Sequence, residues 1–87
     1  MSFRIESREV DQKIVLHLHG QLVGTEAERI LRDQIVRAVA DRGHVTVDAG
    51  EMTVFDPGCL AVIQAGLGDW LTLVGGGAYL ELMLRRK

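Results

Sequence analysis

Residues 25–48 read TEAERILRDQIVRAVADRGHVTVD, and this stretch decides the class of fold. Thr25 followed three residues later by Glu28 is the capping-box pattern of a helix start, and Gly43 is placed as a left-handed stop. The β-branched run at 44–48 is typical of a buried strand. Between these signals, apolar side chains recur at the spacing of one helix face: Ala27, Ile30, Leu31, Ile35, Ala38 and Val39.

Two segments before this helix alternate apolar and polar residues, as half-buried strands do. They are residues 3–8 and residues 13–19, with a turn at 10–12 between them and Gly20 as the end of the second. The helix therefore connects a hairpin to the strand at 44–48. A strand, helix and strand in this order pair in parallel through a right-handed crossover, so we expect an α/β fold.

The chain after this unit predicts a second helix and a further strand. Asp56-Pro57 offers an N-cap and a proline at the first helical position, for a helix that reaches about Ala65. Residues 70–74 are typical of a strand. Residues 78–87 alternate like a strand, but their Ala, Leu, Glu and Met content favours a helix, which we expect. The predicted architecture is a small mixed β-sheet with helices packed on it, in the order β-β-α-β-α-β-α.

Composition limits the classes of function. Eighty-seven residues predict a single domain, residues 1–87, and 47% hydrophobic with 25% charged residues predicts a folded chain. Ten Lys and Arg against twelve Asp and Glu give a net charge of −2, which disfavours nucleic acid or an anionic membrane as a partner. A single cysteine predicts no disulfide within the chain and a cytoplasmic location. No apolar run reaches the roughly 18 residues of a membrane span, so we expect none.

Several segments together resemble the STAS domain of anti-sigma factor antagonists and of the cytoplasmic tails of sulphate transporters. Residues 14–22, IVLHLHGQL, look like the family's second strand ending in Gly-x-Leu, and Thr25-x-Ala27-Glu28 looks like its first helix start. Residues 45–63, VTVDAGEMTVFDPGCLAVI, follow the family's strand, Asp, loop, Asp-Ser-Ser-Gly-Leu and helix. The final strand fits as well. The resemblance spans nearly the whole chain.

The resemblance implies a function and also an unusual feature. Family members bind a protein partner, and a partner kinase phosphorylates a Ser or Thr two residues after the motif aspartate. That position is Gly58 here, and Pro57 lies between; Val23 stands where an Asp is common. The resemblance thus implies a non-enzymatic regulatory module of bacterial transcription signalling, without the serine switch. The partner-binding residues it implies are Gly24, Thr53, Phe55, Asp56, Pro57, Gly58 and Cys59.

Other functions stay open from the sequence. One is the STAS subunit of a lipid-transporting ABC system, which would bind the ATPase of that system. Another is a domain that binds a nucleotide or small molecule through Gly75-Gly76-Gly77. The expected partner is an anti-sigma factor of the serine-kinase-like kind or an ABC ATPase, and a homodimer is a further candidate. We predict no catalytic residue, cofactor or metal ligand.

Simpler structural roles also explain the residues singled out. Asp56 can be a plain N-cap, and Cys59, in the first turn of a helix, is either a reactive thiolate or a small packing residue. Phe55, in the loop before that helix, can form a docking patch or cover the end of the sheet. Three histidines can meet as a metal site or lie exposed on the sheet: His17, His19 and His44.

Overall fold

The computed structural model describes residues 3–77. Its elements are β1 (Phe3–Val10), β2 (Lys13–Leu22), α1 (Thr25–Arg42), β3 (Val45–Phe55), α2 (Pro57–Gly66) and β4 (Leu71–Val74). The predicted order of these six elements is confirmed. The helix predicted at 78–87 lies outside the described residues.

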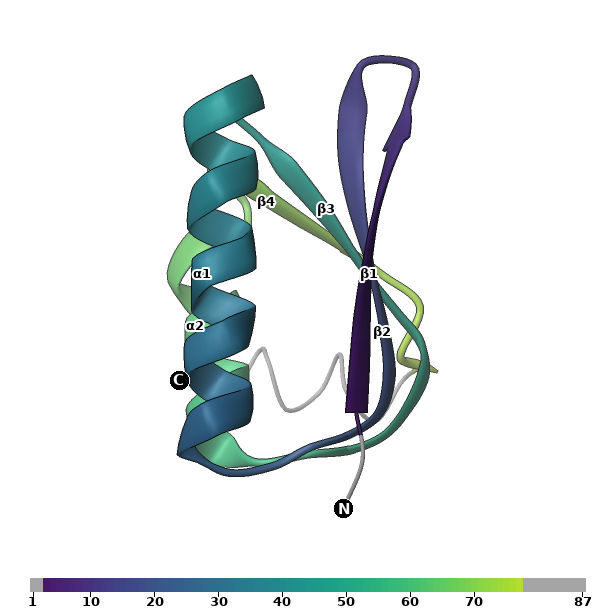
Figure 1. Cartoon of the computed structure of the whole chain (residues 1–87), viewed down its shortest axis with the longest axis vertical. Helices are drawn as coiled ribbons and strands as arrows, with labels where there is room; N and C mark the ends of the chain where they lie inside the picture. Colours follow the sequence, from purple (N-terminus) through teal and green to yellow (C-terminus); the bar gives the residue numbers. More distant parts are fainter. Residues whose placement is uncertain (1–2, 78–87) are drawn as a thin grey trace.

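The four strands form one mixed sheet in the order β1-β2-β3-β4. β1 and β2 are antiparallel, whereas β2 and β3, and likewise β3 and β4, are parallel. Both helices lie on the same side of this sheet (Figure 1). The α/β class and the parallel pairing across α1 are therefore as predicted.

The hairpin between β1 and β2 is tighter than the sequence pattern indicates. Asp11 and Gln12 both have left-handed backbone angles, with φ of 53° and 67°. Two such residues make the two-residue turn whose twist matches that of paired strands. Val10 therefore pairs with Lys13, and β1 continues two residues beyond the predicted end at Arg8.

β3 is much longer than the strand predicted at 44–48, and Phe55, which the sequence placed in the loop before the second helix, is instead the last residue of this strand. The strand continues through Gly50 to Phe55, because β2 also extends past Gly20 and supplies partners as far as Leu22. His17 pairs with Asp48 but His19 pairs with Glu51, so β3 has one extra residue there. A second extra residue lies between Met52 and Val54. These bulges bend the strand toward the start of α2.

The capping box predicted at Thr25 is also wrong. Gly24 is the N-cap of α1, with φ of 100°, and no side chain caps the helix there. Thr25 is instead the first helical residue. The predicted end is correct, since Gly43 has φ of 78° and its N–H donates to the carbonyl of Val39.

The core lies between the sheet and the two helices. No charged or polar side chain is buried in it among residues 3–77. No helix in that range is both long enough and apolar enough to cross a lipid bilayer. The core residues are contributed by every element except β1: Leu16, Leu18, Leu22, Ala27, Leu31, Ile35, Ala38, Val45, Val47, Ala49, Cys59, Leu60, Val62, Ile63 and Leu71.

Candidate functional site

Asp56 joins the two loops that precede the helices. One carboxylate oxygen, Oδ2, accepts a hydrogen bond of 2.7 Å from the backbone N–H of Gly24. The other, Oδ1, accepts a 2.9 Å hydrogen bond from the N–H of Cys59, which is the N-cap contact predicted for α2. The Asp56 N–H in turn donates to the carbonyl of Leu22. The ends of β2 and β3 and the starts of both helices are therefore held together, an arrangement that we call the Asp56 clasp.

The clasp favours the ionised carboxylate. The N–H of Gly24, and then that of Cys59, hold the pKa of Asp56 below its ordinary value. Partial burial acts in the opposite direction but is the weaker effect. The aspartate is thus a fixed negative charge at neutral pH, at the positive end of the α2 dipole.

Gly58 lies in the first turn of α2, against a carboxylate from α1. A Cβ built at this position would lie 2.5 Å from Oε1 of Glu28 and 3.6 Å from Oδ1 of Asp56. Oε2 of Glu28 also accepts a 2.6 Å hydrogen bond from Arg32. Gly58 thus has no side chain of its own, and the carboxylates of Glu28 and Asp56 lie beside it.

Cys59 is a core residue. Its side chain is fully buried, and burial raises the pKa of the thiol to about 12, with a further rise from the Asp56 carboxylate beside it. A position at a helix start is expected to lower a thiol pKa, but at Cys59 this effect is smaller than the effect of burial. The reactive-thiolate interpretation of Cys59 is therefore wrong, and its packing role holds.

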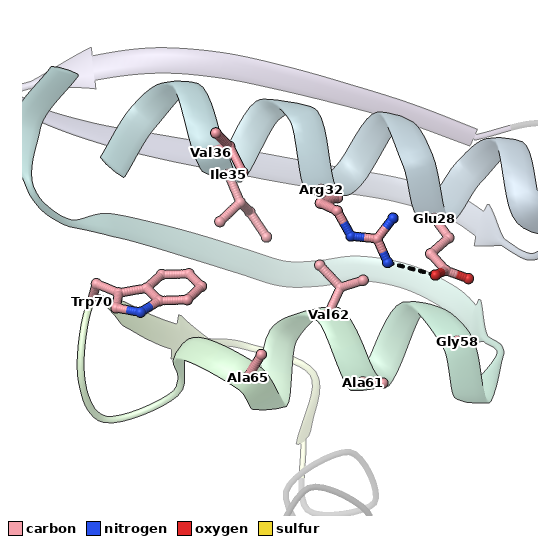
Figure 2. Close-up of a pocket in the computed structure, with 9 residues that line it drawn as sticks. All are labelled: Glu28, Arg32, Ile35, Val36, Gly58, Ala61, Val62, Ala65 and Trp70. Carbon is pink, nitrogen blue, oxygen red and sulfur yellow. Dashed lines mark hydrogen bonds and ion pairs between the residues drawn. The ribbon is translucent and has the colours of Figure 1, made fainter. Parts of the chain in front are cut away.

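A groove of about 300 Å³ runs between α1 and α2. Figure 2 shows Ile35 and Val62 on its two walls, Trp70 at one end and the Glu28–Arg32 pair at the other. Small residues of α2 form one side of it: Gly58, Ala61 and Ala65. The groove therefore begins at the Asp56 clasp and continues along the helix pair.

The other predicted site residues, Thr53, Phe55 and Pro57, make none of the hydrogen bonds of the Asp56 clasp described above. Thr53 is exposed in the bulged end of β3, and Pro57 is exposed at the first position of α2. Phe55 pairs with Leu22 and is partly buried against the core, so it covers the end of the sheet. Gly24, Asp56, Gly58 and Cys59 meet at the clasp.

The three histidines have separate neighbours. Nδ1 of His17 lies 3.3 Å from Asp48, and Nε2 of His19 lies 3.4 Å from Glu6. His44 lies 3.0 Å from the hydroxyl of Thr72. Within residues 3–77 no three His, Cys, Asp or Glu side chains converge as metal ligands would.

The residues of the groove were missed by sequence reasoning. Arg32, Val36 and Trp70 come from α1 and from the turn before β4, and no local motif joins them. The sequence held one signal for this groove. Residues 57–66 are predicted to form a surface helix, and yet none of them is charged.

The site offers a clasped carboxylate, an exposed loop edge and an apolar groove, which are means of non-covalent docking. No protein-family model and no curated protein matches this chain.

Proposed function

We propose that this chain is a non-enzymatic regulatory module that binds a protein partner, resembles an anti-sigma factor antagonist, and works without a serine phosphorylation switch. The observation that carries the proposal is the Asp56 clasp. It fixes the end of β3 and the start of α2 relative to the start of α1. A surface that is already rigid loses little conformational entropy when a partner binds it.

The surroundings of Gly58 support the proposed absence of a serine switch. A glycine has no hydroxyl to accept a phosphate. The carboxylates of Glu28 and Asp56 already stand beside that position, so a phosphate would meet like charges there. The partner that we propose is a cytoplasmic anti-sigma factor of the serine-kinase-like kind, bound in a state that does not depend on phosphorylation.

The test is a pull-down of the tagged chain from its native cell, with identification of bound proteins by mass spectrometry. Thr53→Lys places a bulky cation on the proposed surface at the end of β3. Val10→Lys is the matched control, because Val10 is 51% exposed at the hairpin, the opposite end of the sheet (Figure 1). Both variants are first compared with the wild type by circular dichroism and thermal unfolding.

We expect an anti-sigma factor to bind the wild type and Val10→Lys at equal yield, and Thr53→Lys to lose it. The intact mass of the recovered chain should show no phosphate. Recovery of an ABC ATPase in its place would replace this function with the lipid-transport one. Equal loss of the partner from both variants would refute the location of the surface.

A further inference from the structure

The outer edge of β1 carries a row of backbone groups that no strand of residues 3–77 pairs with. β1 is the first strand in the order of the sheet, is eight residues long, and pairs with β2 without a bulge. Natural sheets shorten an edge strand, bend it with a bulge or place a proline in it, because a long straight edge recruits another strand. β1 has none of these three features, so it is suited to pairing with a further strand.

The hairpin turn decides which residues of β1 direct their backbone groups outward. In a two-residue hairpin the pair that flanks the turn, here Val10 with Lys13, is hydrogen-bonded across the strands. Such pairs recur at every second residue, so each second residue back from Val10 is bonded to β2. The residues between them include Phe3, Ile5 and Ser7. Their N–H and C=O groups therefore point away from β2, toward the open edge.

The side chains of β1 divide between the two faces of the sheet. Phe3 and Ile5 lie on the helix side, partly buried against the core. Arg4, Glu6 and Arg8 lie on the opposite face. There Glu6 lies 3.4 Å from Arg4 and 3.5 Å from Arg8, and the two arginine side chains are 65% and 64% exposed. The charges along this face therefore alternate in sign and are open to a neighbouring strand.

A second copy of β1 is the strand that these charges fit. Two β1 strands related by a two-fold axis perpendicular to the sheet run antiparallel, and the axis passes beside one residue of each strand. With the axis at Ile5, Arg4 of each copy lies opposite Glu6 of the other, so two pairs of opposite charge form. On the helix side Ile5 lies opposite Ile5, and Phe3 lies opposite Ser7. These are the residues whose backbone groups point outward, so they can complete the hydrogen bonds of the new strand pair.

The neighbouring registers fit less well. With the axis at Arg4 or at Glu6, that charged residue lies opposite its own copy, and like charges destabilise a cross-strand pair. With the axis two residues after Ile5, Glu6 lies opposite Arg8, but Ile5 then lies opposite the charged Glu9. Of these four registers, the one at Ile5 alone combines opposite charges on one face with apolar contact on the other.

We propose that this chain forms a two-fold dimer in which the β1 strands of two copies pair antiparallel about Ile5 and join the two sheets into one. The contact is a short length of strand, so it buries less area than a standard interface and gives a weak dimer. β2 separates β1 from the end of β3, where the proposed partner surface at Thr53 lies. Either proposal can therefore fail while the other stands.

Sedimentation equilibrium of the full chain tests the dimer, over concentrations from about 1 μM to about 1 mM, where moderate and weak association is measured. We expect the wild type to dimerise in this range. Arg4→Glu should raise the dissociation constant at least about tenfold, because two pairs of opposite charge become pairs of like charge. Arg8→Glu is the matched control, because Arg8 is as exposed as Arg4 and as close to Glu6 of its own chain. It lies outside the charged pairs of this register, so Arg8→Glu should not weaken the dimer.

Mixing two variants tests the register itself. Arg4→Glu and Glu6→Arg should each associate poorly alone, and an equimolar mixture should recover association, because each chain supplies the charge that the other lacks. Thermal unfolding confirms that each variant is folded. A wild type that is monomeric throughout overturns the proposal. So does a dimer that Arg4→Glu leaves intact, one that Arg8→Glu weakens as much as Arg4→Glu, or a mixture that associates no better than its components.

Discussion

Replacing Asp56 by alanine tests the clasp most directly. The variant loses the N-cap bond to Cys59, which is worth about 1 kcal/mol. It also loses the hydrogen bond that the Gly24 N–H donates to the charged carboxylate. We take the contribution of this bond to stability as about 1 kcal/mol, at the lower end for a charged group, because Asp56 is partly exposed. The free energy of unfolding should therefore fall by about 2 kcal/mol at pH 7, or about 8–16 °C in Tm for a domain of this size.

The pH dependence gives the same prediction a second, independent readout. The pKa of Asp56 is below its ordinary value of 3.8 in the folded chain. The stabilisation that the ionised Asp56 gives to the folded chain is therefore fully present above pH 3.8, and it is lost as the pH falls through the lowered pKa. The difference between wild type and Asp56→Ala should therefore be constant above about pH 5 and should shrink in acid.

Urea unfolding followed by circular dichroism, repeated from neutral to acidic pH, measures both effects. Asp56→Asn should lose less than Asp56→Ala, because its amide oxygen can still cap α2. Asp69→Ala, at an exposed aspartate before β4, is the control and should stay within about 0.5 kcal/mol of the wild type. The reasoning fails if Asp56→Ala is as stable as this control, or if its deficit is unchanged in acid.

Three further substitutions or measurements examine the helix pair. A methyl group at Gly66 would overlap the ring of Trp70, so Gly66→Ala should lower the unfolding free energy by about 1–3 kcal/mol in urea. The unfolding free energy of Gly58→Ala should stay within about 0.5 kcal/mol of the wild type, because only the end of the flexible Glu28 side chain must move. Equal losses of stability in Gly66→Ala and Gly58→Ala would contradict the packing described. With a thiol pKa of about 12 in a buried site, Cys59 should resist Ellman's reagent at pH 8 until urea unfolds the chain, and rapid labelling of the folded chain would be evidence against its burial.

The order of elements could be predicted from the sequence because each of them carries its own periodicity. α1 has an apolar face and a glycine stop, and α2 has the Asp56-Pro57 start. These signals arise within a few residues of one another, so no knowledge of the neighbouring strands is needed. The same reasoning predicted the parallel crossover between β2 and β3, which the structure confirms.

What could not be predicted depends on residues far apart in the chain. Thr25 has the pattern of an N-cap, but the helix is capped at Gly24, whose N–H is bound by Asp56 thirty-two residues away. Gly50 has the pattern of a strand end, but pairing with β2 carries β3 through it. The groove likewise depends on how α1 and α2 pack, which neither helix specifies alone.

The two-residue turn at Asp11 and Gln12 has a consequence for how fast the chain folds. Every pair of the β1–β2 hairpin forms between residues close in sequence, so this part closes on the microsecond timescale typical of hairpins. The pairing of Ile14 with Val45 must wait until the intervening α1 has brought distant residues together, which costs loop-closure entropy. We therefore expect formation of the parallel β2–β3 pair, rather than of the hairpin, to be the slow step in folding of the domain.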